Sequence, residues 1–471
     1  LRKALRLLLW AAVFIAAAHV AVSYIIDYWG SSKFAHAQAL VRQAGLPLTY
    51  EDPEYAAWQN VYFDETSANA AVYYEAAYSL LRPLPEEETL ELLPIVGKAE
   101  LPTDPRAPLA PDAVSRMRDY IFARTRILDI LHEASRLRAC KYTIDWDACK
   151  FSLPHHSGAR RAAGLLAVAI CLDAEANRPS DSVERVRDGL AVARSLWDEP
   201  IGYSWIIGRN TYDKILCSGL ERLLAETDPS DEDLVDLQSD IAEAADKFSV
   251  KASFVGEIVS WTDSFQRLTD GRVETVDAFN DNGEPRTPIE LAKLKFIMWS
   301  GRGTSKSMWA GHTLALLKMT EYASDPTPEV LRRAADSRMY NEIAQNLRTW
   351  PFVNEGMILP SWPRTIQEGE SLRARLRAAA ACIAALRYRN HNGAWPADLN
   401  ALVPAYLAAV PVDPFTGSAL VYKVSDDGIM AYSVGPDLKD DEGKPNLQIR
   451  PEDVKKEEWE KYDDSGFRIW K

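Results

Sequence analysis

The sequence predicts a mainly α-helical protein with an N-terminal transmembrane helix, an irregular or solenoid-like array of helices, and a small C-terminal α+β domain. Three observations predict it: an uncharged apolar run near the N-terminus, apolar residues at helical spacing through the middle, and two strand-like segments joined by a turn near the C-terminus. We therefore expect an anchor at residues 1–29, a helical domain at 30–365, and an α+β domain with an acidic C-terminal tail at 366–471.

The composition is that of an ordinary globular protein. Of 471 residues, 47% are hydrophobic and 26% are charged, and the net charge is −14. These values exclude a disordered chain, a collagen and a small disulfide scaffold. The acidic balance also argues against a nucleic-acid partner, because binding to phosphates needs a concentrated basic face.

Residues 7–26 contain no Asp, Glu, Lys or Arg, and as a helix they would be about 30 Å long, which matches the hydrocarbon core of a bilayer. Arg2, Lys3 and Arg6 precede the run and should stay in the cytoplasm, so the body is expected outside the cytosol. A cleaved signal peptide, whose apolar region is usually shorter, and a buried core helix are the alternatives. His19 within the run is interpreted as a tolerated or packed polar residue, with a proton relay as the alternative.

The middle of the chain, from about residue 31 to 357, is predicted to be helical. Helix-start signals, in which Pro, Ser, Thr or Asp precedes an apolar run, occur at residues 110–112, 230–233, 287–288 and 327–329. The segments 157–197 and 203–247 each predict an αα-hairpin, and the spacing of their starts is close to that of helical repeats.

Cys140 and Cys149 flank a short non-helical stretch and are the candidate disulfide of an exported protein, although spacing alone does not show that their sulfurs meet. The other cysteines lie in apolar helical stretches, where a cysteine is usually a small buried hydrophobic residue. No CxxCH motif occurs, so haem is not expected. The Gly-rich stretch 301–306 lacks the residue order of a P-loop, so no nucleotide site is expected.

His155 and His156 follow Pro154 at a predicted helix start. Their first interpretation is capping or packing, because neighbouring residues on a helix point in different directions and do not readily share a metal ion. Together with Asp145, they mark where an exported hydrolase-like enzyme would have its site, in a groove of the helical domain.

The C-terminal hundred residues have a different pattern. Residues 371–390 predict an amphipathic helix, and 399–407 a short helix. The segments 419–424 and 429–434 flank a Ser-Asp-Asp-Gly turn and predict a β-hairpin on which the long helix packs. Asp413-Pro414-Phe415-Thr416-Gly417 predicts a turn that docks Phe415 in the core.

In residues 371–446, an amphipathic helix followed by Y…NG.WP..L..L, VPVDPFTG, LVY and YSVGPDLKDDEG resembles the globular head of the major pseudopilin of type II secretion systems. The rest of the chain is similar to uncharacterised bacterial exported helical proteins. In pseudopilins the loop after YS.G.D binds calcium, so the resemblance implies a calcium site at Ser433, Asp437, Asp440 and Asp441, with a solvated acidic turn as the alternative. The anchor lacks a pseudopilin cleavage signal, which implies a reused head rather than a polymerising subunit.

These expectations favour a non-enzymatic, single-pass scaffold of the bacterial inner membrane, with a cytoplasmic N-terminus and a periplasmic body. Its expected partners are the bilayer, through residues 7–26, and other proteins of an envelope or secretion-type assembly. The alternatives are the hydrolase-like enzyme and a subunit of a large membrane-bound energy or transport complex.

Overall fold

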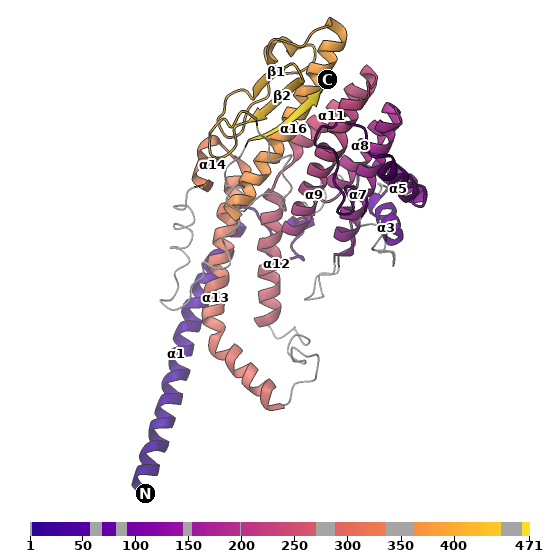
Figure 1. Cartoon of the computed structure of the whole chain (residues 1–471). Helices are drawn as coiled ribbons and strands as arrows, with labels where there is room; N and C mark the ends of the chain where they lie inside the picture. Colours follow the sequence, from indigo (N-terminus) through magenta and orange to yellow (C-terminus); the bar gives the residue numbers. More distant parts are fainter. Residues whose placement is uncertain are drawn as a thin grey trace.

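The computed structural model describes residues 2–56, 68–81, 92–144, 153–197, 199–269, 288–335, 362–443 and 464–471. Within these ranges the protein is mainly helical, with a three-stranded antiparallel sheet near the C-terminus. Figure 1 shows a long N-terminal helix that projects from a body of packed helices, with the sheet at the opposite end of the molecule. The mainly helical fold class predicted from the sequence is therefore confirmed.

The elements follow one another along the chain. The first are α1 (Arg2–Gln43), α2 (Pro53–Ala56), α3 (Ala70–Leu80), α5 (Pro111–Phe122), α6 (Thr125–Ser135), α7 (Pro154–Glu175) and α8 (Pro179–Arg194). Next come α9 (Gly202–Lys214), a π-helical turn (Ile215–Leu220), α10 (Glu221–Glu226), α11 (Asp231–Lys247), α12 (Lys251–Thr269), α13 (Pro288–Ser324) and α14 (Pro328–Ala335). The last are α16 (Trp362–Asn392), a 3-10 turn (Leu399–Leu402), β1 (Val421–Ser425), β2 (Gly428–Ser433) and β3 (Ser465–Trp470).

The predicted start signals coincide with helix starts. The Ser230 hydroxyl accepts a hydrogen bond from the backbone N–H of Asp233 and caps α11. Pro111, Pro288 and Pro328 are the first residues of α5, α13 and α14, where proline's missing N–H removes no helical hydrogen bond.

The apolar run of α1 is exposed on the surface of the molecule. Trp10 and Phe14 are 71% and 73% exposed, and His19 lies on the same exposed part of the helix. Within the described part of the chain, α1 is the helix whose length and apolar composition are sufficient to cross a membrane. It continues without a break past the apolar run 7–26 into a segment from Asp27 to Gln43, which we call the stem.

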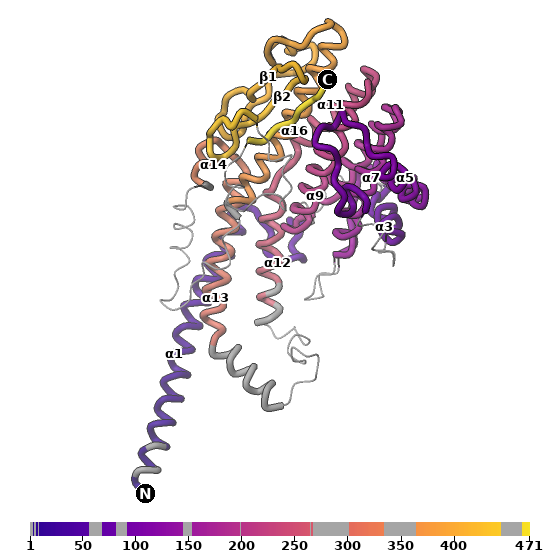
Figure 2. The backbone as a smooth tube through the Cα atoms, in the orientation of Figure 1, coloured from indigo at the N-terminus to yellow at the C-terminus, as the bar shows by residue number. Residues whose placement is uncertain are grey.

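The stem packs against α13, and the two helices run side by side in Figure 2. Their backbones come into contact where Gly30 meets Gly303, since a Cβ on either glycine would overlap backbone atoms of the other helix. At the same level, Asp27 pairs with Lys306 at 2.8 Å and with Arg302 at 2.9 Å. The Gly-rich stretch of α13 is therefore the crossing point of these helices.

The body is built around α7, most of whose residues are buried. α7 packs against α8, and this pair is the αα-hairpin predicted for residues 157–197. The hairpin predicted for 203–247 is wrong, because α11 makes its extensive contacts with α16, from a distant part of the chain, and with α8.

The apolar stripe of α11 explains why α16 packs against this helix. Leu234, Leu237 and Ile241 are fully buried. At the end of the same interface, Arg387 of α16 forms an ion pair with Asp231 at 2.8 Å. The long helix of the C-terminal domain is thus packed into the helical body as well as onto the sheet.

The sheet has the strand order β1-β2-β3, and α16 covers it through contacts with β2 and β3. Buried side chains of the two strands, including Ile429, Ala431, Phe467 and Ile469, form the sheet's part of the core. The predicted hairpin is confirmed as β1 and β2, paired antiparallel.

Two C-terminal expectations need correction. The end of the predicted acidic tail, Ser465–Trp470, is a strand that pairs with β2. The short helix predicted for 399–407 is a 3-10 turn, Leu399–Leu402. Pro404 follows, and proline disfavours helical geometry in the residue before it, so the turn does not extend into a helix.

Candidate functional site

The turn before β1 holds a buried carboxylate. Asp413 is 1% exposed and accepts hydrogen bonds from the backbone N–H groups of Phe415 (2.8 Å), Thr416 (3.4 Å) and Val434 (3.2 Å) and from the Ser433 hydroxyl (2.8 Å). Phe415 is buried beside it, as the sequence predicted.

Two of the four residues predicted to bind calcium therefore have protein partners. Ser433 donates its hydroxyl to Asp413 and accepts a hydrogen bond from the backbone N–H of Gly435 at 3.1 Å. The Asp437 carboxylate accepts hydrogen bonds from the backbone N–H and from the ammonium group of Lys439, both at 3.0 Å.

The other two predicted residues lie with a third carboxylate, Asp464. Asp464 Oδ2 accepts hydrogen bonds from the backbone N–H groups of Asp441 at 3.1 Å and Gly443 at 2.8 Å. Asp440 is exposed, and its carboxylate accepts a hydrogen bond from the Tyr432 hydroxyl at 2.7 Å. We call Asp440, Asp441 and Asp464 the acidic cluster.

The carboxylates of the acidic cluster repel one another and are partly withdrawn from water. Asp441 Oδ2 and Asp464 Oδ1 are buried and have no hydrogen-bond partner in the described part of the chain. Burial raises the pKa of Asp464 to about 6, and repulsion from Asp441 and Asp440 adds to the rise. Sequence reasoning missed Asp464, which lies 23 residues after Asp441 and belongs to no motif.

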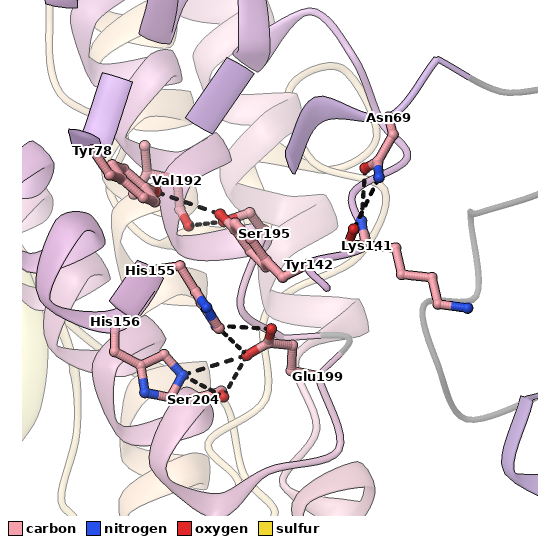
Figure 3. Close-up of polar contacts among 10 residues, drawn as sticks. All are labelled: Asn69, Tyr78, Lys141, Tyr142, His155, His156, Val192, Ser195, Glu199 and Ser204. Carbon is pink, nitrogen blue, oxygen red and sulfur yellow. Dashed lines mark hydrogen bonds and ion pairs between the residues drawn. The ribbon is translucent and has the colours of Figure 1, made fainter. Parts of the chain in front are cut away.

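A second cluster lies at the start of α7, and Figure 3 shows the Glu199 carboxylate reached by two imidazole rings. His155 Nε2 is 2.9 Å from Glu199 Oε1, and His156 Nε2 is 3.4 Å from Glu199 Oε2. Ser204 Oγ lies 2.7 Å from His156 Nε2 and 2.6 Å from Glu199 Oε2. We call these four residues the histidine cluster.

His155 and His156 are both buried, in keeping with the packing role expected of them, but the argument that they cannot share a partner is wrong. The Nε2 atoms of both rings reach one carboxylate, that of Glu199, in the segment between α8 and α9. Burial raises the pKa of Glu199, but hydrogen bonds from His155 and His156 outweigh it and hold the pKa below its usual value.

A packed polar chain holds the ring of His155 in place. Tyr142 stacks on it with ring centroids 4.2 Å apart and an interplanar angle of 8°. The Tyr142 hydroxyl lies 3.0 Å from Ser195 Oγ and 3.4 Å from the Tyr78 hydroxyl, and Ser195 donates to the carbonyl oxygen of Val192 (Figure 3). The cluster is therefore supported by α3, α8 and the segment before α7.

Two other predicted sites lie at the edge of the described residues. Cys140 is buried, while Cys149 and Asp145 lie outside the described residues. The disulfide therefore stays a prediction, as does a hydrolase site that includes Asp145.

The structure also has a cavity of about 260 Å³ between α5, α6, α7 and α8. Its charged lining residues are Arg118, Asp173, Glu175, Arg178 and Arg185. Asp173 forms an ion pair with Arg178 there. The histidine cluster contributes none of the lining residues, so the cavity and the predicted hydrolase site are different places.

The fold and the two clusters define a helical protein with an exposed apolar N-terminal helix and a small α+β unit. No family model matches the sequence, and neither the curated proteins nor the solved structures contain a detectable match.

Proposed function

We propose that this protein is a membrane-anchored extracytoplasmic scaffold of a bacterial envelope or secretion-type assembly. The observation that carries the proposal is the exposed apolar segment 7–26 of α1, which continues into a stem packed against the body. A helix with apolar side chains on all its faces is stable in a bilayer and costly to expose to water. The stem contacts would then hold the body at a defined angle to the membrane.

The proposed orientation follows from charge. Arg2, Lys3 and Arg6 precede the apolar segment, and basic residues flanking a span remain cytoplasmic. The body is then periplasmic, and the resemblance of residues 371–446 to a pseudopilin head supports a role in presenting surfaces to other subunits. The alternative of an exported hydrolase-like enzyme stays a hypothesis.

Protease accessibility tests the location and orientation of the body. Protease added to spheroplasts is expected to digest the body, and inverted inner-membrane vesicles are expected to protect it. A cytosolic marker protein serves as the control in both preparations. Protection in spheroplasts, or recovery of the intact chain in the soluble fraction, would contradict the proposal.

The scaffold role has its own test. Crosslinking in intact cells, followed by purification in mild detergent, is expected to yield discrete species that contain this chain and defined envelope proteins. A lone monomer before and after crosslinking would refute the scaffold role while leaving the membrane anchor intact.

The proposal includes a calcium ion at the acidic cluster. Asp440 and Asp441 come from the predicted set, and Asp464 takes the place of Ser433 and Asp437. Like those two, Asp440 accepts hydrogen bonds from protein groups, the Tyr432 hydroxyl and the backbone N–H of Glu442. Carboxylate oxygens are the hard ligands that calcium prefers, and the buried oxygens of Asp441 and Asp464 lack hydrogen-bond partners in the described chain. Calcium would offset the repulsion within the cluster.

The raised pKa of Asp464 predicts a pH dependence. Between its ordinary value of 3.8 and about 6, the folded state binds more protons than the unfolded state, so stability is lost as the pH rises through this range. We expect Asp464→Asn to remove this loss of stability, which is on the order of 1 to 3 kcal/mol for a pKa shift of this size. Thermal unfolding in the presence of a chelator, at pH 4.5 and pH 7.5, measures it.

Calcium should raise the melting temperature of the wild-type protein at pH 7.5 and leave that of Asp464→Asn unchanged. Asp426→Asn, at an exposed carboxylate in the β1–β2 turn, is the control and should respond as the wild type does. A wild-type protein that is insensitive to both calcium and chelator would remove calcium from the proposal.

A further inference from the structure

We propose that His155, His156 and Glu199 form a zinc site. It lies in the helical body and is separate in place and chemistry from the acidic cluster. The site would join the first turn of α7 to the segment between α8 and α9.

The donor set suits zinc. Two imidazole nitrogens and one carboxylate are typical protein ligands of Zn²⁺, which takes four ligands in tetrahedral geometry. Calcium prefers a larger set made of oxygen atoms alone, so the histidine cluster selects a different ion.

The geometry brings the three donors within reach of one ion. One ligand atom from each of His155, His156 and Glu199 lies within 4.8 Å of the other two. At zinc–ligand bonds of about 2.0 to 2.1 Å, neighbouring ligands of a tetrahedral site are separated by about 3.4 Å. The contacts of Glu199 with the two rings, at 2.9 Å and 3.4 Å, are already close to that separation. Small rotations of the side chains would open the space that the ion needs.

The burial of these three side chains gives an electrostatic reason for a cation to bind among them. His155, His156 and Glu199 are 4%, 2% and 7% exposed, so the carboxylate is withdrawn from water. Within the described chain, Glu199 contacts these two histidines and forms no ion pair with a lysine or arginine. A divalent cation would balance the carboxylate while both rings remain neutral, as zinc binding requires.

Ser204 is the fourth polar side chain of the histidine cluster. Its hydroxyl is within hydrogen-bond distance of both His156 Nε2 and Glu199 Oε2 and can orient the carboxylate or occupy the fourth position. Without an ion the four side chains hydrogen-bond to one another, but His156 Nδ1 and Glu199 Oε1 stay buried without a hydrogen-bond partner in the described chain. The experiment separates these two states.

The test uses the full-length protein in detergent, stripped of metal with a chelator and dialysed. Titration of the wild type with Zn²⁺ is expected to show one tight site, and Co²⁺ in its place should give the visible absorption of a tetrahedral ion with nitrogen and oxygen ligands. Glu199→Gln and His156→Gln keep side chains of similar size and should each weaken binding by at least about 100-fold. Failure of the wild type to bind Zn²⁺ or Co²⁺ would overturn the proposal.

Three matched variants establish where the ion binds. His391→Gln alters an exposed histidine beside Tyr406 and should bind zinc as the wild type does. Asp464→Asn should also retain the site, which excludes binding at the acidic cluster. Ser204→Ala keeps all three donors and should keep the metal. If Glu199→Gln and His156→Gln bind Zn²⁺ as tightly as the wild type, the histidine cluster is a hydrogen-bond network without metal.

Discussion

Gly303→Ala is expected to separate the stem of α1 from α13. A Cβ at this position would overlap backbone atoms of Ile26 and Asp27, which cannot move aside as a flexible side chain would. We expect a cost of about 3 kcal/mol at the crossing, which corresponds to more than a hundredfold faster hydrogen exchange in the stem. Hydrogen exchange with mass spectrometry, on the full chain in detergent, measures it directly.

The same helix provides a matched control two residues away. A Cβ at Gly301 would have no neighbouring atom within 4 Å, so Gly301→Ala should be neutral or slightly stabilising through its higher helix propensity. Equal exchange rates in the two variants would show that the two helices do not approach closely at Gly303. That result would also weaken the proposal that the stem orients the body.

Asp413→Ala is expected to destabilise the sheet domain by about 3 kcal/mol or more. The substitution removes the acceptor for three backbone N–H groups and the Ser433 hydroxyl, in a place where the carboxylate is 1% exposed. Each buried donor left without a partner costs about 1 to 3 kcal/mol, reduced where water can enter. Thermal unfolding followed by the near-ultraviolet signal of the aromatic residues in this domain measures the loss.

Asp426→Ala is the control for this substitution, because Asp426 is exposed in the turn between β1 and β2. Its expected effect is within about 0.5 kcal/mol, as for most surface positions. A comparable loss in both variants would show that the hydrogen bonds of Asp413 are not what stabilises the turn.

The features that the sequence predicted correctly are local ones. An uncharged apolar run, a proline or serine before an apolar stripe, and a Ser-Asp-Asp-Gly turn each act through residues a few positions apart. Their physical effects, such as the capping of α11 by Ser230, do not depend on the rest of the fold. For this reason the helix starts and the β1–β2 hairpin agree with the prediction.

The incorrect predictions concern long-range partners. The stripe of Leu234, Leu237 and Ile241 shows that α11 buries one face, but any apolar surface could cover it. α16 does so from more than 100 residues away, and its Arg387 pairs with Asp231. β3 was missed for a similar reason: a six-residue strand becomes stable when β2 is beside it.

The two clusters show the same limit at the level of single side chains. Asp440 and Asp441 were visible as an acidic run, but Asp464 reaches them because β3 pairs with β2. His155 and His156 were visible as a pair, but their shared partner Glu199 lies 43 residues or more along the chain. No spacing rule connects such residues.

The sequence by itself determined that this chain is mainly helical, has an apolar N-terminal helix of membrane-spanning length, and ends in a helix-and-hairpin unit, because hydrophobic periodicity and turn chemistry are encoded within short windows. Only the tertiary structure decided which helices share a core, which carboxylates converge at the acidic cluster, and that two adjacent histidines meet one buried glutamate. Those outcomes depend on packing between distant segments, where burial and charge are set by neighbours that local patterns do not specify.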